Sequence, residues 1–214
     1  MTTDWVTISS FATAGGTLVL AVATFASVRS ANQAARTAQQ ALQVNLRPVL
    51  TSSRLQDPTV KVGWMDEHWA AVGGGRAVAE YVDGNIYLAM SLRNVGSGLA
   101  VIHGWHPSGA ATAGGRDHAD PDAFRMQTRD LYVPPADNSF WQGAIRDTAD
   151  PDHAWLAEAI TARRRFTIEL LYGDHEGGQR TISRFGIIPR EDADDQEWMC
   201  TVSLHWNLDR PDPR

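Results

Sequence analysis

The feature that most constrains this chain is an uncharged run near its N-terminus. From Trp5 to Val28 the sequence holds 24 residues without an acid or a base. At about 1.5 Å per helical residue, such a run is about 36 Å long, which is enough to cross a hydrocarbon core of about 30 Å. The sequence therefore predicts an N-terminal transmembrane helix over residues 1–28.

Two other interpretations of this run compete with a permanent anchor. A secretory signal places basic residues before a shorter apolar stretch, whereas here the first arginine, Arg29, follows the run. The tripeptide at 21–23 imitates a cleavage site, but the charge order argues against cleavage. The alternative that stays open is a helix docked inside a larger assembly, as one of its subunits.

The charges beyond the run predict its orientation. Arg29, Arg36 and Arg47 follow it, and no acid occurs between residues 29 and 47. Since cytoplasmic flanks carry an excess of basic residues, we expect the C-terminal side in the cytoplasm and the short N-terminus outside. The predicted location is thus the cell membrane, with one span in the lipid bilayer and a cytoplasmic C-terminal domain.

Small side chains recur along the span and continue into a helical stalk over residues 29–47. A face of small residues favours close packing with a partner helix or a second copy of the chain, and it comprises Ser9, Ala12, Thr13, Gly16, Thr17 and Ala21. In the stalk, spacings of three and four residues give a short coiled-coil seam, formed by Ala31, Ala35, Ala38 and Leu42. A merely alanine-rich span and a solvated stalk remain the alternatives. Pro48 is expected to end the helix.

Beyond the stalk, charge and cysteine content restrict the function. The part after residue 47 has 16 basic and 24 acidic residues, a balance of −8. This acidity argues against a nucleic-acid partner, because such binding depends on clustered basic side chains. Cys200 is the sole cysteine, so no intramolecular disulfide is possible.

From residue 48 onward the hydrophobic pattern has the period of strands. In the segment 85–94, Ile86, Leu88, Met90 and Leu92 alternate with Tyr87, Ala89, Ser91 and Arg93, which predicts a half-buried strand. A second strand is expected to turn Trp198, Cys200, Val202, Leu204 and Trp206 inward, and a third Phe166, Ile168, Leu170 and Tyr172. Further strands are expected at 49–55, 99–106, 128–133, 138–145 and 180–188.

This pattern predicts a mainly β fold for residues 48–214. The expected architecture is an antiparallel Ig-like β-sandwich with one short helix, preceded by the transmembrane helix and the helical stalk. The short helix is expected after Asp150, a good N-cap, with Pro151 in its first turn. The glycine- and alanine-rich segments 70–80 and 108–123 are expected to be exposed loops.

Several segments carry a resemblance to a known group of proteins. They are "LRPVL" at 46–50, "NVGSGLA" at 94–100, "YGDHEGGQRTISRFGI" at 172–187 and "HWNLDRPDPR" at 205–214. With the uncharged span and stalk, the chain resembles uncharacterised single-pass membrane proteins of high-GC bacteria that have a cytoplasmic β-sandwich. The resemblance implies this layout and no activity, so it supplies no catalytic positions.

Three groups of residues were considered as sites of chemistry. His103 and His106 have a spacing that suits a metal, but on one strand they point to opposite faces. Asp174, His175 and Glu176 are better explained as a solvated turn before two glycines, and Cys200 as a buried thiol. We therefore predict no cofactor, no metal and no enzymatic activity. The alternative is a small-ligand or metal-dependent enzyme that uses loop residues such as His103, Asp174 and His175.

Aromatic residues near loops and strand ends offer a candidate binding surface. It comprises Trp64, Trp69, Trp105 and Trp141. Exposed aromatic rings mark interaction surfaces, although most tryptophans of a sandwich lie in its core. The function expected from the sequence is a membrane-anchored interaction or scaffold module, which associates with a protein partner or with itself through the N-terminal helix.

Overall fold

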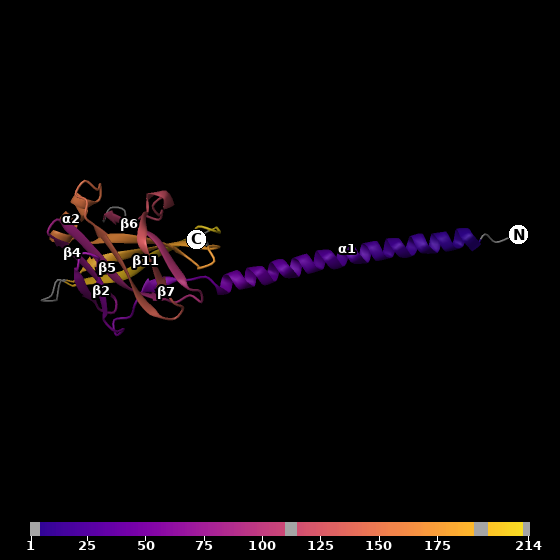
Figure 1. The fold of residues 1–214 in the computed structure, drawn as a ribbon, viewed down its shortest axis with the longest axis horizontal. Helices are drawn as coiled ribbons and strands as arrows, with labels where there is room; N and C mark the ends of the chain where they lie inside the picture. The colour runs from indigo at the N-terminus through magenta and orange to yellow at the C-terminus, as the bar shows by residue number, and fades with distance from the viewer. Residues whose placement is uncertain (1–4, 110–114, 191–196, 212–214) are drawn as a thin grey trace. The chain divides into compact units, whose positions relative to one another are not determined.

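The chain divides into two compact units, Met1–Val44 and Asn45–Arg214 (Figure 1). The structure, a computed structural model, describes residues 5–109, 115–190 and 197–211. Side chains at 5–12, 40 and 42–45 lie outside this description.

The first unit consists of a single continuous helix. Helix α1 runs from Trp5 to Asn45 over 41 residues, so the expected span and stalk form one helix that ends before Pro48. The hydroxyls of Thr17 and Thr37 donate back to the carbonyls four residues earlier, at 2.8 and 3.0 Å, which satisfies these polar groups within the helix. The stretch Thr13–Gln39 contains an 18-residue window with a mean hydropathy of 1.3, so the helix is long and apolar enough to cross a membrane. A long apolar N-terminal helix followed by a β-rich domain fits a single-pass membrane protein.

The second unit is mainly β, as predicted. Its elements are β1 (Leu50–Ser52), β2 (Val60–Gly63), β3 (Trp69–Val72), β4 (Arg76–Val82), β5 (Asn85–Asn94), β6 (Ala100–Gly109), a short 3-10 turn (Pro121–Ala123), β7 (Arg125–Val133), β8 (Asn138–Ile145), α2 (His153–Thr161), β9 (Phe166–Gly173), β10 (Arg180–Pro189) and β11 (Trp198–Asn207). Every strand pair among the described residues is antiparallel. The prediction of a mainly β, antiparallel domain with one short helix is confirmed.

The described strands form one curled sheet and one hairpin. The nine-stranded sheet has the order β1-β5-β4-β11-β10-β9-β6-β7, with β8 paired to β5, while β2 and β3 pair with each other. The layers expected of a sandwich are therefore parts of one continuous sheet, which curls around a common core. Large side chains such as Trp141, Phe166 and Phe185 fill this core, and α2 adds Leu156 and Ile160 to it.

Strand β5 differs from its prediction because both of its faces are buried. The β2–β3 hairpin covers the face that was expected to meet solvent, and Val62 and Trp64 pack there against Tyr87 and Ala89. The segment 70–80, expected to be a loop, instead forms the end of β3, a turn and most of β4. A pattern of period two shows which residues share a face but not what a distant hairpin covers.

Strand β11 also departs from the expected single inward face. Its register with β10 shifts where Arg184 pairs with Leu204 and Phe185 with Val202. Ser203 is thus an extra residue, and a β-bulge of this kind exchanges the two faces of the strand. The main core therefore contains Trp198 and Cys200, whereas Trp206 belongs to a separate cluster; Val202 is 38% exposed.

Candidate functional site

The resembling segments meet where the chain leaves α1 and enters the β domain. Residues 46–49, named the joining segment here, run directly across the turn at 94–98. A Cβ atom at Gly98 would lie 1.7 Å from the carbonyl oxygen of Leu46, and one at Gly96 would lie 2.4 Å from that of Arg47. Both positions therefore require glycine, because any side chain would push the joining segment off the sheet.

The side chain of Asn94 fastens this crossing. It is fully buried, and its Oδ1 accepts hydrogen bonds from the backbone N–H groups of Val49 (3.1 Å) and Gly96 (3.0 Å). Its Nδ2 donates to the carbonyls of Gly98 (2.7 Å) and Val133 (2.9 Å). Since an amide side chain offers two donors and two lone pairs, all four are used, and Asn94 joins the segment to two other parts of the domain.

Arg47 extends this attachment to the C-terminal end of the chain. Its guanidinium donates to Asn207 Oδ1 at 2.7 Å and forms an ion pair with Asp209. Partial burial raises the pKa of Asp209, but the hydrogen bond and charge of Arg47 outweigh this, and the pKa lies below its usual value. "LRPVL" is thereby linked to "HWNLDRPDPR".

A chain of buried hydroxyl groups links the same region to the remaining segment, residues 172–187. The N–H of Leu50 donates to Tyr172 Oη at 3.1 Å, which lies 2.9 Å from Ser183 Oγ; Ser183 Oγ lies in turn 2.7 Å from His205 Nδ1. Burial raises the pKa of Tyr172 to about 12. The phenol therefore stays protonated at physiological pH and serves this chain as a fixed hydrogen-bonding group. All four segments that carry the resemblance thus contribute to one attachment. Local sequence patterns do not predict this, because the four segments are far apart in the chain.

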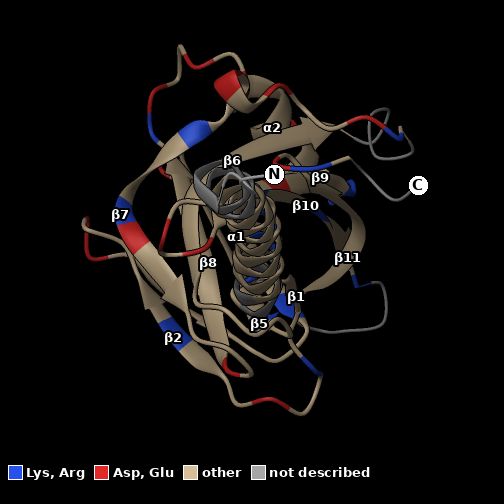
Figure 2. Cartoon of the chain, turned by 90° about the vertical axis from the view of Figure 1, so that its right-hand side faces the viewer, with Lys and Arg blue, Asp and Glu red and all other residues tan. Residues whose placement is uncertain are grey.

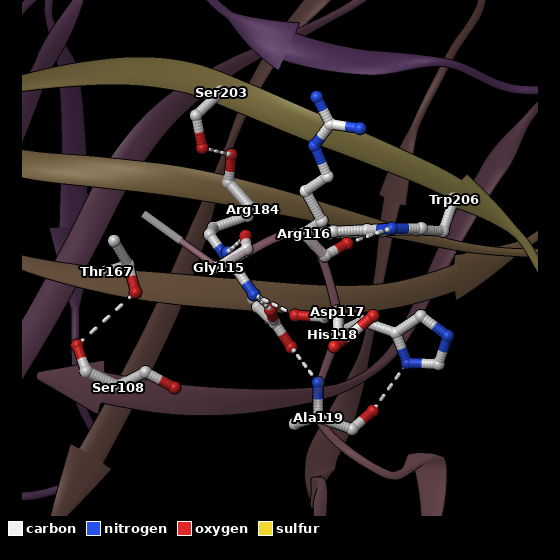
Figure 3. Close-up of polar contacts among 11 residues, drawn as sticks. Ser108, Gly115, Arg116, Asp117, His118, Ala119, Thr167, Arg184, Ser203 and Trp206 are labelled. Atoms are coloured by element: carbon white, nitrogen blue, oxygen red, sulfur yellow. Dashed lines mark hydrogen bonds and ion pairs between the residues drawn. The ribbon is translucent and has the colours of Figure 1, made fainter. Parts of the chain in front are cut away.

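A second site is a buried ion pair on the outer face of β9 and β10. Arg184 and Glu169 are each 1% exposed at their side chains, with 2.7 Å between Arg184 Nη2 and Glu169 Oε1. Arg184 also donates to the carbonyls of Gly115 and Asp117, and Glu169 Oε2 accepts from the N–H of Ala119 at 2.9 Å. These bonds hold the backbone of residues 115–119 against the sheet, and Figure 3 shows Arg184 beside this segment.

Trp206 closes this pair from the side. Its indole N–H donates to the carbonyl of Arg116 at 3.0 Å, and the Arg184 guanidinium lies 5.0 Å from its ring centroid (Figure 3). The pair is buried because a loop distant in sequence folds over it. Sequence reasoning missed it, since Glu169 and Arg184 occupy positions that alternation assigns to the outer face.

A third site is a cleft of about 380 Å³ between β7 and β8. Trp64, Trp105, Arg125, Arg129 and Arg146 are among the residues that line it. Figure 2 shows that β7 carries both basic and acidic positions.

The predicted tryptophan surface is not formed. Trp64, Trp105 and Trp141 are only 6%, 4% and 1% exposed, because the hairpin packs Trp64 onto Tyr87 and the other two rings pack together in the core, with centroids 5.2 Å apart. Trp69 alone of the four is open, at 59% exposure, with the Lys61 ammonium 4.8 Å from its ring centroid.

The residues considered for chemistry have structural surroundings. Asp174 is buried, and its Oδ1 accepts from the N–H of Gly178 at 2.9 Å, as expected of a turn. His103 lies close to Gly173, at the same end of β9, and its pKa is lowered by burial and then by Arg180. Among the described residues, no three His, Cys, Asp or Glu side chains are grouped so that they would hold a metal. Burial raises the pKa of the Cys200 thiol to about 12.

The predicted packing faces of α1 are partly described. Thr13, Gly16, Thr17 and Ala21 of the small-residue face are exposed, and so are Ala31, Ala35 and Ala38 of the stalk seam. The side chains of Ser9, Ala12 and Leu42 lie outside the described residues. Helix association through either face stays a prediction.

Comparison with known proteins does not extend this description. No family model matches the chain, and no curated protein matches it. A crystal structure of a protein from Archaeoglobus fulgidus is similar over 62% of this chain and 93% of its own, with 16% identity and a TM-score of 0.24. A similarity of this size carries no argument about fold or function.

The joining segment provides a first test. We expect Gly98→Ala to lower the free energy of unfolding by about 2–3 kcal/mol, because the added methyl overlaps the carbonyl of Leu46. Gly178→Ala is the matched control, since a Cβ there comes no closer than 3.7 Å to another atom, and its effect should stay within about 0.5 kcal/mol. Urea unfolding of the full chain in detergent, followed by tryptophan fluorescence, measures both. Equal losses in the two variants would contradict the crossing.

The buried ion pair provides a second test. Arg184→Met leaves the Glu169 carboxylate buried without its cation, and we expect a loss of about 3–5 kcal/mol in the free energy of unfolding. Adding Glu169→Leu removes the stranded charge and should restore part of that loss. The same unfolding measurement gives the coupling in a double-mutant cycle. Additive losses would show that the two charges do not act as a pair.

Proposed function

We propose that this chain is a single-pass membrane protein whose β domain is a cytoplasmic interaction module. The observation that carries the proposal is the attachment of the joining segment. Residues 46–49 follow α1 directly, and they are held because Val49 donates to Asn94 and Arg47 donates to Asn207. The next residue, Leu50, donates to Tyr172. The β domain therefore includes the residues that directly follow the helix in the sequence.

The location and orientation in this proposal come from α1 and its flanking charges. The stretch Thr13–Gln39 meets the length and hydropathy of a span, and its described side chains are all exposed to the surroundings of the helix. Leu18, Val22 and Phe25 are each more than 60% exposed, which suits contact with lipid. Arg29 and Arg36 support a cytoplasmic C-terminal side by the positive-inside rule.

An interaction role is favoured over catalysis by what the polar residues do. Asp174 closes a turn, Tyr172 and Ser183 hold β1, and Glu169 with Arg184 fixes a loop. The hydrogen bonds and ion pair of these groups stabilise the fold of the domain. The small-residue face of α1 gives the same module a means of self-association in the bilayer.

The anchoring is tested by fractionation of cells that express the full chain with a C-terminal tag. We expect the tag to remain in alkali-washed membranes and to resist protease in intact spheroplasts until lysis, because the domain lies inside. Known periplasmic and cytoplasmic proteins serve as controls for protease access. Digestion of the tag from outside would reverse the orientation, and its release by alkali would refute the anchor.

A matched pair of variants distinguishes insertion into the membrane from non-specific adsorption to it. Leu18→Arg combined with Val22→Arg places two charges in the span, at a cost of about 2.5–3.5 kcal/mol each, and should deplete the chain from washed membranes. Leu18→Ala combined with Val22→Ala should leave it there. Equal retention of both variants would contradict insertion.

A further inference from the structure

The cleft between β7 and β8 lies between two strand edges that do not pair. Residues 134–137 connect these consecutive strands, yet among the described strands β7 pairs only with β6 and β8 only with β5. The result is an opened hairpin with a cleft of about 380 Å³ along it. An edge strand presents backbone N–H and C=O groups that a further strand is able to pair with.

A bulge in β7 shapes one wall of this cleft. Ile102 of β6 pairs with Leu131 and Gly104 with Met126, so residues 127–130 of β7 lie opposite His103 alone. These extra residues leave the regular ladder with β6. Bulges of this kind redirect side chains and end pairing, and here Gln127 and Arg129 reach across to β8.

The side-chain amide of Gln127 bonds to one main-chain group at the edge of β8 and to one side chain of the same strand. Its Nε2 donates to the carbonyl of Gln142 at 2.8 Å, and its Oε1 accepts from Trp141 Nε1 at 3.3 Å. The β8 main chain at this edge therefore already accepts one hydrogen bond from an amide, while the second bond comes from the indole of Trp141. A main-chain N–H of an added strand is the same kind of donor to the Gln142 carbonyl.

Exposed apolar side chains border the same cleft. Met65 is 98% exposed and Met126 is 69% exposed, the highest values among large hydrophobic residues in the described part of the second unit. Both line the cleft, together with the nearly buried rings of Trp64 and Trp105. Flexible methionine side chains adapt to different apolar partners, so this arrangement favours a ligand with an apolar side chain.

Three arginines, Arg125, Arg129 and Arg146, and two acidic residues, Asp147 and Asp150, line the cleft, and of the three arginines Arg129 is the one that suits an acidic group in the ligand. Arg125 forms ion pairs with Asp150 and Asp152, and Arg146 pairs with Asp66, whose pKa the Arg146 hydrogen bond lowers to about 2. Arg129 instead donates to the neutral amide oxygen of Gln142, at 2.7 Å. No ion pair of Arg129 occurs within the described part of the chain. A carboxylate is the stronger partner for a guanidinium.

We propose that this cleft binds an extended peptide segment of a partner protein by strand addition to the edge of β8. The peptide backbone takes over the hydrogen bond that the Gln127 amide donates to the Gln142 carbonyl, an acidic side chain pairs with Arg129, and an apolar side chain packs between Met65 and Met126. Main-chain bonds and alternate side-chain contacts are the usual basis of recognition in this mode. The inference rests on the proposed function as an interaction module and names the chemistry of its partner.

The probe for this proposal is a displayed library of random peptides of about 12 residues, selected on the full chain in nanodiscs. We expect the selected peptides to share an acidic residue among alternating apolar ones. For the tightest synthetic member, Arg129→Gln should weaken the dissociation constant at least ten-fold. Arg165→Gln, which removes an exposed arginine after α2, is the matched control and should leave it unchanged.

Two further changes test strand addition itself. N-methylation of alternate peptide amides removes donors without altering side chains, and we expect it to weaken binding at least ten-fold. Gln127→Ala frees the edge of β8 and should maintain or tighten binding. The proposal is overturned if no peptide is enriched, or if binding is insensitive to both Arg129→Gln and N-methylation, as it would be for a small anion or a second copy docking elsewhere.

The outcome is separable from that of the proposed function. A partner that the membrane-bound chain retains after Arg129→Gln would leave the interaction module in place and refute the cleft. Peptide binding at the cleft by a chain that alkali releases from membranes would support the cleft and refute the anchor.

Discussion

The crossing of residues 46–49 over the turn at 94–98 is the constraint on which the rest of the β domain depends. It requires glycine at 96 and 98, and it requires the buried amide of Asn94 to replace the hydrogen bonds that the irregular backbone would otherwise lose. Because β1 pairs with the end of β5 directly beside this crossing, the first strand of the domain is positioned by it. The chain therefore begins its β fold within a few residues of the end of α1.

The same sheet also has an open region, where β7 and β8 lie next to each other without pairing. Strand β5 is paired by β8 along one side and by β4 and β1 along the other, and β7 ends the far side of the sheet. The curl brings these two edges together without a ladder, and side chains of Gln127 and Arg129 bridge them instead. Side-chain bridges protect an edge from uncontrolled pairing, while they remain easier to exchange than a continuous ladder. The buried attachment of the joining segment and the side-chain bridges at the cleft thus lie in different parts of one domain.

Local patterns were sufficient to predict most strands and the short helix. The expected strand at 138–145 is β8, and the alternating residues from Phe166 to Tyr172 are the inward face of β9. Local patterns did not show which surfaces are buried by segments that lie far away in the sequence. The second face of β5 is buried by the β2–β3 hairpin, the Glu169–Arg184 pair by residues 115–119, and three of the four candidate tryptophans by their neighbours. The bulge at Ser203 was hidden for a different reason, since one added residue leaves the composition of a strand unchanged. The two glycines of "NVGSGLA" were the only local sign of the crossing at the joining segment. The residues that cross them lie about fifty positions earlier in the chain, so the sequence did not identify them.

Hydrogen exchange of the full chain in nanodiscs tests the central claim, that the joining segment belongs to the folded core of the domain. Amides fastened by buried partners exchange only when the whole domain unfolds. The account predicts that the peptide covering residues 46–51, with the bonds of Val49 and Leu50 to Asn94 and Tyr172, exchanges as slowly as β9. Exchange as fast as that of the exposed turn at 175–178 would show a loose connection and contradict the account.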